Sequence, residues 1–215
     1  EIDPQLILGV CASLIPYPEH NSTPRVTGGT AMVKQSLGLP SSNFLLRPDT
    51  RLHVLHYPQN SLVGTRAMES TRFLRRPGGQ NYVVAVMSHH GYNMQDAVIM
   101  NKGSVDRGLG RSTFLRTYNS ERRRYPGGQF EEIEVPGTGE VEVKGLRTPE
   151  AYSHLEKDGL SVPEVELKGG DVIVGKTSPP RFLEETGTGG FLQAHERRES
   201  SMLIRHGEKG YVSNV

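Results

Sequence analysis

Hydrophobic residues occur mostly in short runs that alternate with polar residues, a pattern typical of strands separated by turns. In the first half these runs are 51–57 (RLHVLHY), 81–87 (NYVVAVM) and, beyond a polar loop, 96–100 (DAVIM). The second half contains STFLRTY, FEEIEVPG, GEVEVKGL, DVIVGKT, SMLIRHG and GYVSNV. The pattern predicts a strand-rich α+β fold, with a mixed first part and a mostly antiparallel second part.

Three helices interrupt this pattern. One is predicted at 30–37 and ends before Gly38 and Pro40, and a short one begins at Ser104. The third covers 148–159, with Thr148 as N-cap and Gly159 as its stop. The glycine-rich stretch 179–200 has little periodicity and is expected to be a mobile loop.

The change of pattern places a domain boundary near residue 111, giving parts 1–111 and 112–215. The 25 glycines and 14 prolines are those of a turn-rich chain, not a helical bundle. The net charge is positive in the first part and negative in the second, so the first part is the better candidate for contact with a polyanion.

Cysteine content and hydropathy bear on the compartment. Cys11 is the only cysteine, so an internal disulfide is impossible and a reducing compartment is the simplest interpretation. No apolar run approaches the ~20 residues that cross a bilayer, and no secretion signal is recognisable. We therefore expect a cytoplasmic protein without a membrane segment. Because the chain starts without Met and stops within a strand-like run, we also expect it to be a piece of a longer one.

Several motifs are weak candidates for chemistry. TGGT at 27–30 precedes the first predicted helix and could hold an anion there, but it matches no nucleotide-binding fingerprint. His89 and His90 would point to opposite faces of a strand, which favours structural roles over metal binding. RRPGGQ at 75–80 and RRYPGGQ at 123–129 are interpreted as Pro-Gly turns that enter strands, although their arginines could touch phosphate.

The remaining candidates suit a nucleoside triphosphate and a polynucleotide. Arg25, in a loop rich in Pro and Gly, could bind a phosphate bidentately, and Lys34 and Gln35 on the following helix could contact a nucleic-acid backbone. Asp96 offers the oxygen that Mg²⁺ prefers. Two-metal phosphoryl transfer needs several carboxylates, so the others would come from another chain. A turn or helix N-cap residue is an equally good interpretation of Asp96.

Several stretches of the sequence resemble those of a known protein family. The matching stretches are ILGVCASLIPYPEHNSTPR, AMVKQSLG, YPQNSLVGTRAME, GGQNYVVAVMSHHGYNMQDAVIMNKGSVDRGL, GDVIVGKTSPP and GEKGYV. In the same order over essentially the whole chain, they resemble the second-largest subunit of multisubunit DNA-directed RNA polymerases. PYPEHN and GKTSPPRFLEE are most similar to the archaeal form of this protein, or to its C-terminal half where the gene is split.

The resemblance implies a transcription enzyme, a nucleotidyltransferase whose largest subunit and other subunits are partners of this chain. Residues 1–111 would belong to the hybrid-binding domain, which contacts template DNA and the RNA–DNA hybrid. Residues 112–215 would belong to the wall, or flap, which in related enzymes also receives initiation factors. The fragment alone is expected to be inactive.

The same resemblance implies roles for single residues. Asp96 would help to hold the second Mg²⁺, shared with the largest subunit, and Arg25 would contact the incoming nucleoside triphosphate. Lys34 and Gln35 would face the hybrid. Gln95 departs from the Glu that commonly precedes this Asp in the family, so one negative charge is missing; its amide could still reach the metal through water.

Two other functions compete with this one. The chain could be a non-catalytic module that binds nucleic acid and scaffolds other subunits, with a structural Asp96. A self-contained metal nuclease is disfavoured because too few carboxylates cluster in the sequence.

Overall fold

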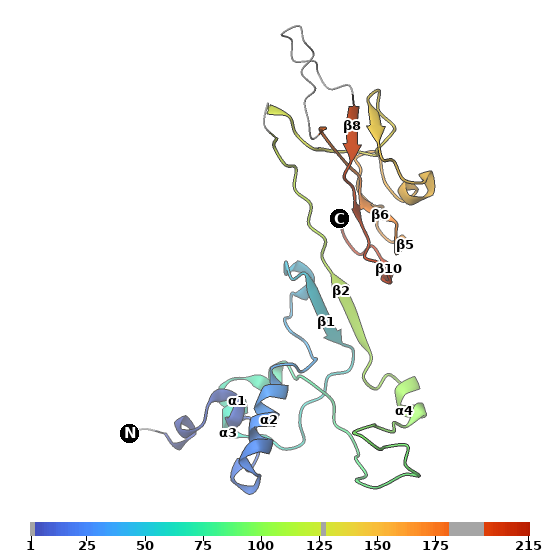
Figure 1. The fold of residues 1–215 in the computed structure, drawn as a ribbon. Helices are drawn as coiled ribbons and strands as arrows, with labels where there is room; N and C mark the ends of the chain where they lie inside the picture. Colours follow the sequence, from blue (N-terminus) through green and yellow to red (C-terminus); the bar gives the residue numbers. More distant parts are fainter. Residues whose placement is uncertain (1–2, 126–127, 181–195) are drawn as a thin grey trace. The chain divides into compact units, whose positions relative to one another are not determined.

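The computed structural model describes residues 3–125, 128–180 and 196–215. The chain divides into two compact units, Glu1–Tyr118 and Asn119–Val215 (Figure 1). The predicted strand-rich α+β class is confirmed. None of the helices in the described ranges combines the length and the apolar character of a membrane span.

The first unit is mainly helical, with one strand pair. Its helices are η1 (Pro4–Ile7), α1 (Val10–Ser13), η2 (Pro18–His20), α2 (Thr23–Val33), η3 (Phe44–Leu46), α3 (Arg66–Ser70), η4 (Phe73–Arg75) and α4 (Lys102–Asp106). The strands β1 (Arg51–Leu55) and β2 (Ser112–Arg116) pair antiparallel, from Arg51 opposite Arg116 to Leu55 opposite Ser112. Buried residues of this unit include Leu14, Val54, Leu55, Ala67 and Met68.

Helix α2 corrects the prediction of a helix at 30–37. It begins seven residues earlier, at Thr23, where Ser22 is the N-cap and Pro24 lies in the first turn. The glycines of TGGT are therefore inside the helix, where each weakens it by about 1 kcal/mol relative to alanine. At Gly29 close packing gives a reason, because an added Cβ would lie 3.3 Å from the Ile15 side chain.

The second unit is built from short strands. They are β3 (Glu132–Ile133), β4 (Glu142–Lys144), β5 (Glu166–Lys168), β6 (Val172–Val174), β7 (Lys176–Ser178), β8 (Glu196–Glu199), β9 (Met202–Leu203) and β10 (Lys209–Tyr211). The sheet has the order β3-β7-β8-β4, and β5 pairs with β10 and β6 with β9. All these pairs are antiparallel except β4 with β8. Val172 and Thr177 are completely buried in this unit.

Two predicted elements of the second unit are wrong or incomplete. Instead of a helix over 148–159 there is a single turn, η6 (Pro149–Tyr152), because Tyr152 is buried and its hydroxyl accepts the Arg147 N–H at 3.1 Å. Gly159, at φ +82°, turns the chain against the backbone of Glu134. Within the predicted loop 179–200, residues 181–195 lie outside the described part, but Glu196–Glu199 forms β8.

The largest difference concerns 82–100, where the sequence predicts two strand runs. The described structure has no strand there, and Figure 1 draws this stretch as an irregular green loop that leads into α4. Extended apolar residues form a strand only when a neighbouring backbone completes the hydrogen-bond ladder. No described segment of this chain provides one.

Candidate functional site

The loop that carries Asp96 starts and ends at one junction. We call residues 82–107 the display loop. At its start, Gln80 Nε2 donates to the Tyr57 carbonyl at 2.9 Å, and at its end the Gly110 N–H donates to Gln80 Oε1 at 2.8 Å. Gly108, at φ +107°, passes so close under the Tyr57 ring that an added Cβ would lie 2.8 Å from it. Tyr57 and Gln80 therefore hold both ends of the loop.

The segment that follows α2 reaches the same junction. The Gly38 carbonyl accepts the Leu55 N–H of β1 at 3.0 Å. An added Cβ at Gly38 would lie 2.6 Å from the Gly78 Cα, so two backbones meet here at a distance that only glycine permits. The sequence RRPGGQ thus provides a crossing of backbones at 77–79, and no strand follows it.

Two tight turns form the part of the display loop around Asp96. The Tyr92 N–H donates to the His89 carbonyl at 3.0 Å, and the Ala97 N–H donates to the Met94 carbonyl at 3.2 Å. The central residues all have positive φ: 50° and 77° at positions 90 and 91, and 55° and 64° at positions 95 and 96. This is the type I′ pattern, which reverses the chain within two residues.

The second turn is a demanding one for its sequence. Glycine, asparagine and aspartate favour such positions, whereas a longer L-residue such as Gln95 costs roughly 1–2 kcal/mol there. His90, Gln95 and Asp96 account for three of the six non-glycine residues with positive φ in the described ranges. Strain of this kind clusters at functional sites, and it makes this loop the leading candidate. The turn interpretation of Asp96 describes its backbone correctly.

Asn93 joins the two turns. Its side-chain Nδ2 donates to the Met87 carbonyl at 2.6 Å, and its Oδ1 accepts the His89 N–H at 3.1 Å. From 81 to 102, a stretch that the structure describes completely, every other residue is exposed and only Asn93 is half-buried. Sequence analysis missed this residue. The available signal was an amide side chain placed between a turn that contains Gly91 and a turn that contains Asp96.

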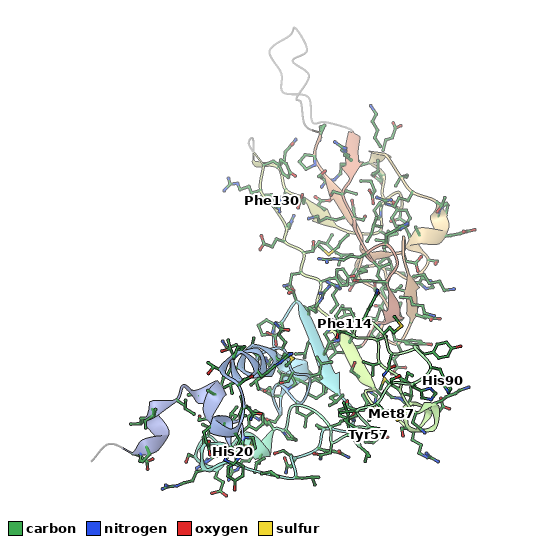
Figure 2. The ribbon with its side chains drawn as sticks, turned by 60° about the horizontal axis from the view of Figure 1, so that its bottom comes forward. His20, Tyr57, Met87, His90, Phe114 and Phe130 are labelled. Carbon is green, nitrogen blue, oxygen red and sulfur yellow. The ribbon has the colours of Figure 1, made fainter. Side chains whose placement is uncertain are left out.

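The display loop also exposes much apolar surface. Val83 and Val86 are as accessible as in an extended chain, at 106% and 98%, and Val98 is 80% exposed. The other exposed large apolar residues of 82–100 are Tyr82, Val84, Met87, Tyr92, Met94, Ile99 and Met100. Figure 2 shows Met87 and His90 in this part of the first unit. So many exposed large apolar residues in one stretch are typical of a contact site.

The Asp96 carboxylate is exposed at the second turn and can supply an oxygen to a metal ion, but not a whole site. No group of three or more His, Cys, Asp or Glu side chains that could hold an ion occurs in the described ranges. The prediction that His89 and His90 point to opposite faces of a strand is wrong. Their rings meet edge to face, with centroids 5.1 Å apart. Asp96 therefore fits a Mg²⁺ site only as one ligand among others supplied from elsewhere.

The other candidate residues lie on α2 and just after it. Arg25 is in the first turn of the helix, not in a loop, and is exposed. Lys34 is the C-cap and Gln35 the next residue, both exposed, so neither lies within the helix. The segment that follows them meets the junction at Gly38. No hydrogen bond or ion pair links the Arg25 and Asp96 side chains, both of which the structure describes. The TGGT amides lie inside α2 and do not form the predicted cradle at a helix N-terminus.

A buried ion pair holds part of the second unit together. The Lys176 ammonium pairs with the Glu131 carboxylate at 2.7 Å, and both side chains are almost buried. Glu131 also accepts from the Arg123 N–H at 3.2 Å and the Tyr125 hydroxyl at 3.0 Å. Burial raises the pKa of the Glu131 carboxyl, but these hydrogen bonds and the Lys176 charge outweigh it, so the pKa lies below its ordinary value.

Arginine side chains stack on one exposed phenylalanine in each unit. Arg51 and Arg116 lie over the Phe114 ring at 5.8 and 5.1 Å, and Arg122 and Arg124 lie over Phe130 at 5.1 and 5.7 Å. Figure 2 labels both phenylalanines. Such combinations of positive charge and aromatic surface are suited to nucleic-acid contact.

These features can be compared with known proteins. The chain belongs to the family described as RNA polymerase Rpb2, domain 6, which matches residues 11–215. The resemblance to the second-largest subunit of RNA polymerases is therefore confirmed.

Individual relatives agree with this family. The chain is 52% identical, over its whole length, to the DNA-directed RNA polymerase subunit Rpo2 of Sulfolobus acidocaldarius and to that of Saccharolobus solfataricus. It is 43% identical to the DNA-directed RNA polymerase II subunit 2 of Arabidopsis thaliana. The chain spans 19% of the length of the two Rpo2 subunits and 18% of the plant subunit.

Proposed function

We propose that this chain is part of the second-largest subunit of a DNA-directed RNA polymerase and contributes Asp96 to the site where the incoming nucleotide is bound. The observation that carries the proposal is the exposed carboxylate at a strained two-residue turn, on a loop whose ends are fixed at one junction. A lone carboxylate presented in this way suits a site that is completed by another subunit.

The resemblance supplies the reaction that this carboxylate would serve. Mg²⁺ ions, when bound, would activate the RNA 3′-hydroxyl and stabilise the charge of the departing pyrophosphate. Asp96 would hold its oxygen toward the second ion, with the remaining ligands on the largest subunit. Gln95, a neutral amide, would add at most a hydrogen bond to metal-bound water.

Arg25, Lys34 and Gln35 would act on the phosphates. Arg25, exposed in the first turn of α2, has a guanidinium free to take two oxygens of the triphosphate and neutralise charge as pyrophosphate leaves. Lys34 and Gln35 would contact the RNA–DNA hybrid. Their position directly before the junction supports this role, because the same backbone crossing fixes the base of the display loop.

The partners follow from the surfaces. The exposed apolar residues of the display loop would pack against the largest subunit or other parts of the polymerase. Residues 1–111 would form part of the hybrid-binding domain and contact template DNA and hybrid. Residues 112–215 would form part of the wall, which would also receive initiation factors. The cytoplasm is the location that this function implies.

Asp96→Asn in the assembled polymerase tests the proposal. Single-nucleotide addition on a preformed RNA–DNA scaffold should slow on the order of 100-fold, the size of effect expected when one preorganised electrostatic contact is removed. High Mg²⁺ should partly restore the rate, and scaffold binding should be unchanged.

The chain offers a matched control for this experiment. Asp106, an exposed acid in α4 of the same loop, undergoes the same chemical change in Asp106→Asn. That variant should add nucleotides at the normal rate. If Asp96→Asn does so too, the carboxylate is structural.

A second function, a non-catalytic binding and scaffold module, is favoured by the arginine–phenylalanine stacks and the exposed apolar loop. It predicts salt-dependent hybrid binding together with a normal rate for Asp96→Asn. The same experiment therefore separates the two functions.

A further inference from the structure

We propose that Asn93 is the positioning residue of the display loop: its side-chain amide sets the geometry in which the loop presents the Asp96 carboxylate. This inference rests on the proposed function, because it assigns a task to Asn93 only if Asp96 binds metal. It concerns a residue that would touch neither metal nor nucleotide.

The hydrogen bonds of Asn93 close the loop across its width. Nδ2 reaches the Met87 carbonyl, six residues back, at 2.6 Å, and Oδ1 receives the His89 N–H, four residues back, at 3.1 Å. The planar amide of Asn93 thus binds, with its donor and its acceptor, the backbone of 87–89, which is the arm that leads into the first turn. The arm and the turn cannot separate without breaking both bonds.

The backbone links these two Asn93 hydrogen bonds to Asp96. The Met94 N–H donates to the Gly91 carbonyl at 3.3 Å, and Met94 in turn accepts from Ala97 across the turn that contains Gln95 and Asp96. Asn93 lies between these turns, so its side chain fixes the point from which the second one starts. The display direction of Asp96 follows from that point.

The loop has few other means of keeping this shape. Gln95 and Asp96 are held at positive φ, a conformation that costs energy and that the surroundings must enforce. All neighbouring side chains from 81 to 102 are exposed and pack little, so no apolar core does so. The Asn93 amide is the polar group that is turned inward, and it therefore carries this task.

The test uses Asn93→Ala in the full-length subunit, assembled into polymerase. By analogy with other outer-shell groups that orient metal ligands, the Mg²⁺ concentration for half-maximal nucleotide addition should rise about 10-fold. Binding of Mn²⁺ to a halted complex with a non-hydrolysable nucleoside triphosphate, followed by paramagnetic resonance, should weaken to a similar extent. Asn93→Gln, which keeps the donor and the acceptor of the side-chain amide, should restore part of this affinity.

A double variant distinguishes positioning from general destabilisation. If Asn93 acts through Asp96, Asn93→Ala combined with Asp96→Asn should need no more Mg²⁺ than Asp96→Asn alone. Asn101→Ala is the matched control: it removes an asparagine of the same loop whose Oδ1 accepts the Ser104 N–H at 2.9 Å and caps α4. It should leave the Mg²⁺ requirement unchanged.

Hydrogen exchange gives a readout that does not depend on activity. Amides 87–97 should exchange faster in Asn93→Ala and at the normal rate in Asp96→Asn. A raised Mg²⁺ requirement for Asp96→Asn with a normal one for Asn93→Ala would overturn this inference and leave the proposed function standing. A normal requirement for Asp96→Asn would overturn the proposed function itself.

Discussion

The display loop and the sheet β3-β7-β8-β4 differ in which side chains they bury and which they expose. In the sheet, charged and hydroxyl groups are turned inward and satisfied: Thr177 is completely buried, and Glu131 has three donors. In the loop, apolar side chains and a carboxylate are turned outward, and one amide, Asn93, keeps the backbone in place. The strands of the sheet find their partners among the described residues of this chain, whereas 82–100 finds no strand partner there.

The largest effect should come from breaking the buried pair of the sheet. Lys176→Met leaves the Glu131 carboxylate buried without its cation, and removing one partner of such a pair costs about 3–5 kcal/mol. Urea unfolding of the chain, followed by circular dichroism, measures this loss. Arg47→Met, which breaks an exposed pair with Asp49 in the first unit, should have a much smaller effect; equal losses would contradict the contrast.

The junction under the display loop should be the next most sensitive point. Gly38→Ala forces a Cβ against the backbone at Gly78, and such overpacking costs about 1–3 kcal/mol. Gly28→Ala is the matched control, because a Cβ there meets open space within α2 and should stabilise the helix by up to about 1 kcal/mol. Unfolding curves of the two variants should therefore shift in opposite directions; a shift of the same sign would show that the crossing at Gly38 is not tight.

The pH dependence of the sheet is a smaller, graded effect. The folded-state pKa of Glu131 lies below the ordinary value of 4.5, so its stabilising contribution is complete above that pH and disappears as the pH falls through the folded-state pKa. The unfolding free energy of the natural chain, measured from about pH 6 to about pH 3, should fall more steeply than that of Glu131→Gln. Parallel curves would show that Glu131 does not contribute to the pH dependence of stability.

The smallest effect concerns the missing charge beside Asp96. Gln95→Glu introduces the acid that the resemblance to RNA polymerase subunits leads us to expect at this position, and one more exposed charge contributes less than about 1 kcal/mol. We expect a Mg²⁺ requirement for nucleotide addition a few-fold lower than with the native Gln95. Identical titrations would show that position 95 does not act on the metal.

The two regions also differ in how far the sequence predicts them. Most strands, β1 and β2 among them, follow from the sequence pattern because their partners lie in the same chain, whereas β5 and β8 were not predicted. The run 82–87 is continuously apolar and rich in valine but forms no strand, since it finds no ladder partner among the described residues. The apolar pattern therefore indicates which residues favour burial, and the partner decides whether they become a strand.

The candidate site shows a similar limit. Asp96 could be selected from its residue type and the family resemblance, and a turn was one of its two local interpretations. The start of α2 was misplaced because Gly28 and Gly29 are typical of a loop, while Gly29 is used for contact with Ile15. The task of Asn93 depends on hydrogen bonds to residues four and six positions away, which no local pattern encodes.

Hydrogen exchange on this chain by itself and within the assembled polymerase tests the central contrast most directly. The amides of 82–100 should exchange rapidly in the isolated chain and be strongly protected in the assembled enzyme, while those of β6 and β7 should be protected in both states. Unchanged rapid exchange of 82–100 in the assembled enzyme would contradict it, because the loop would then have no partner to complete it.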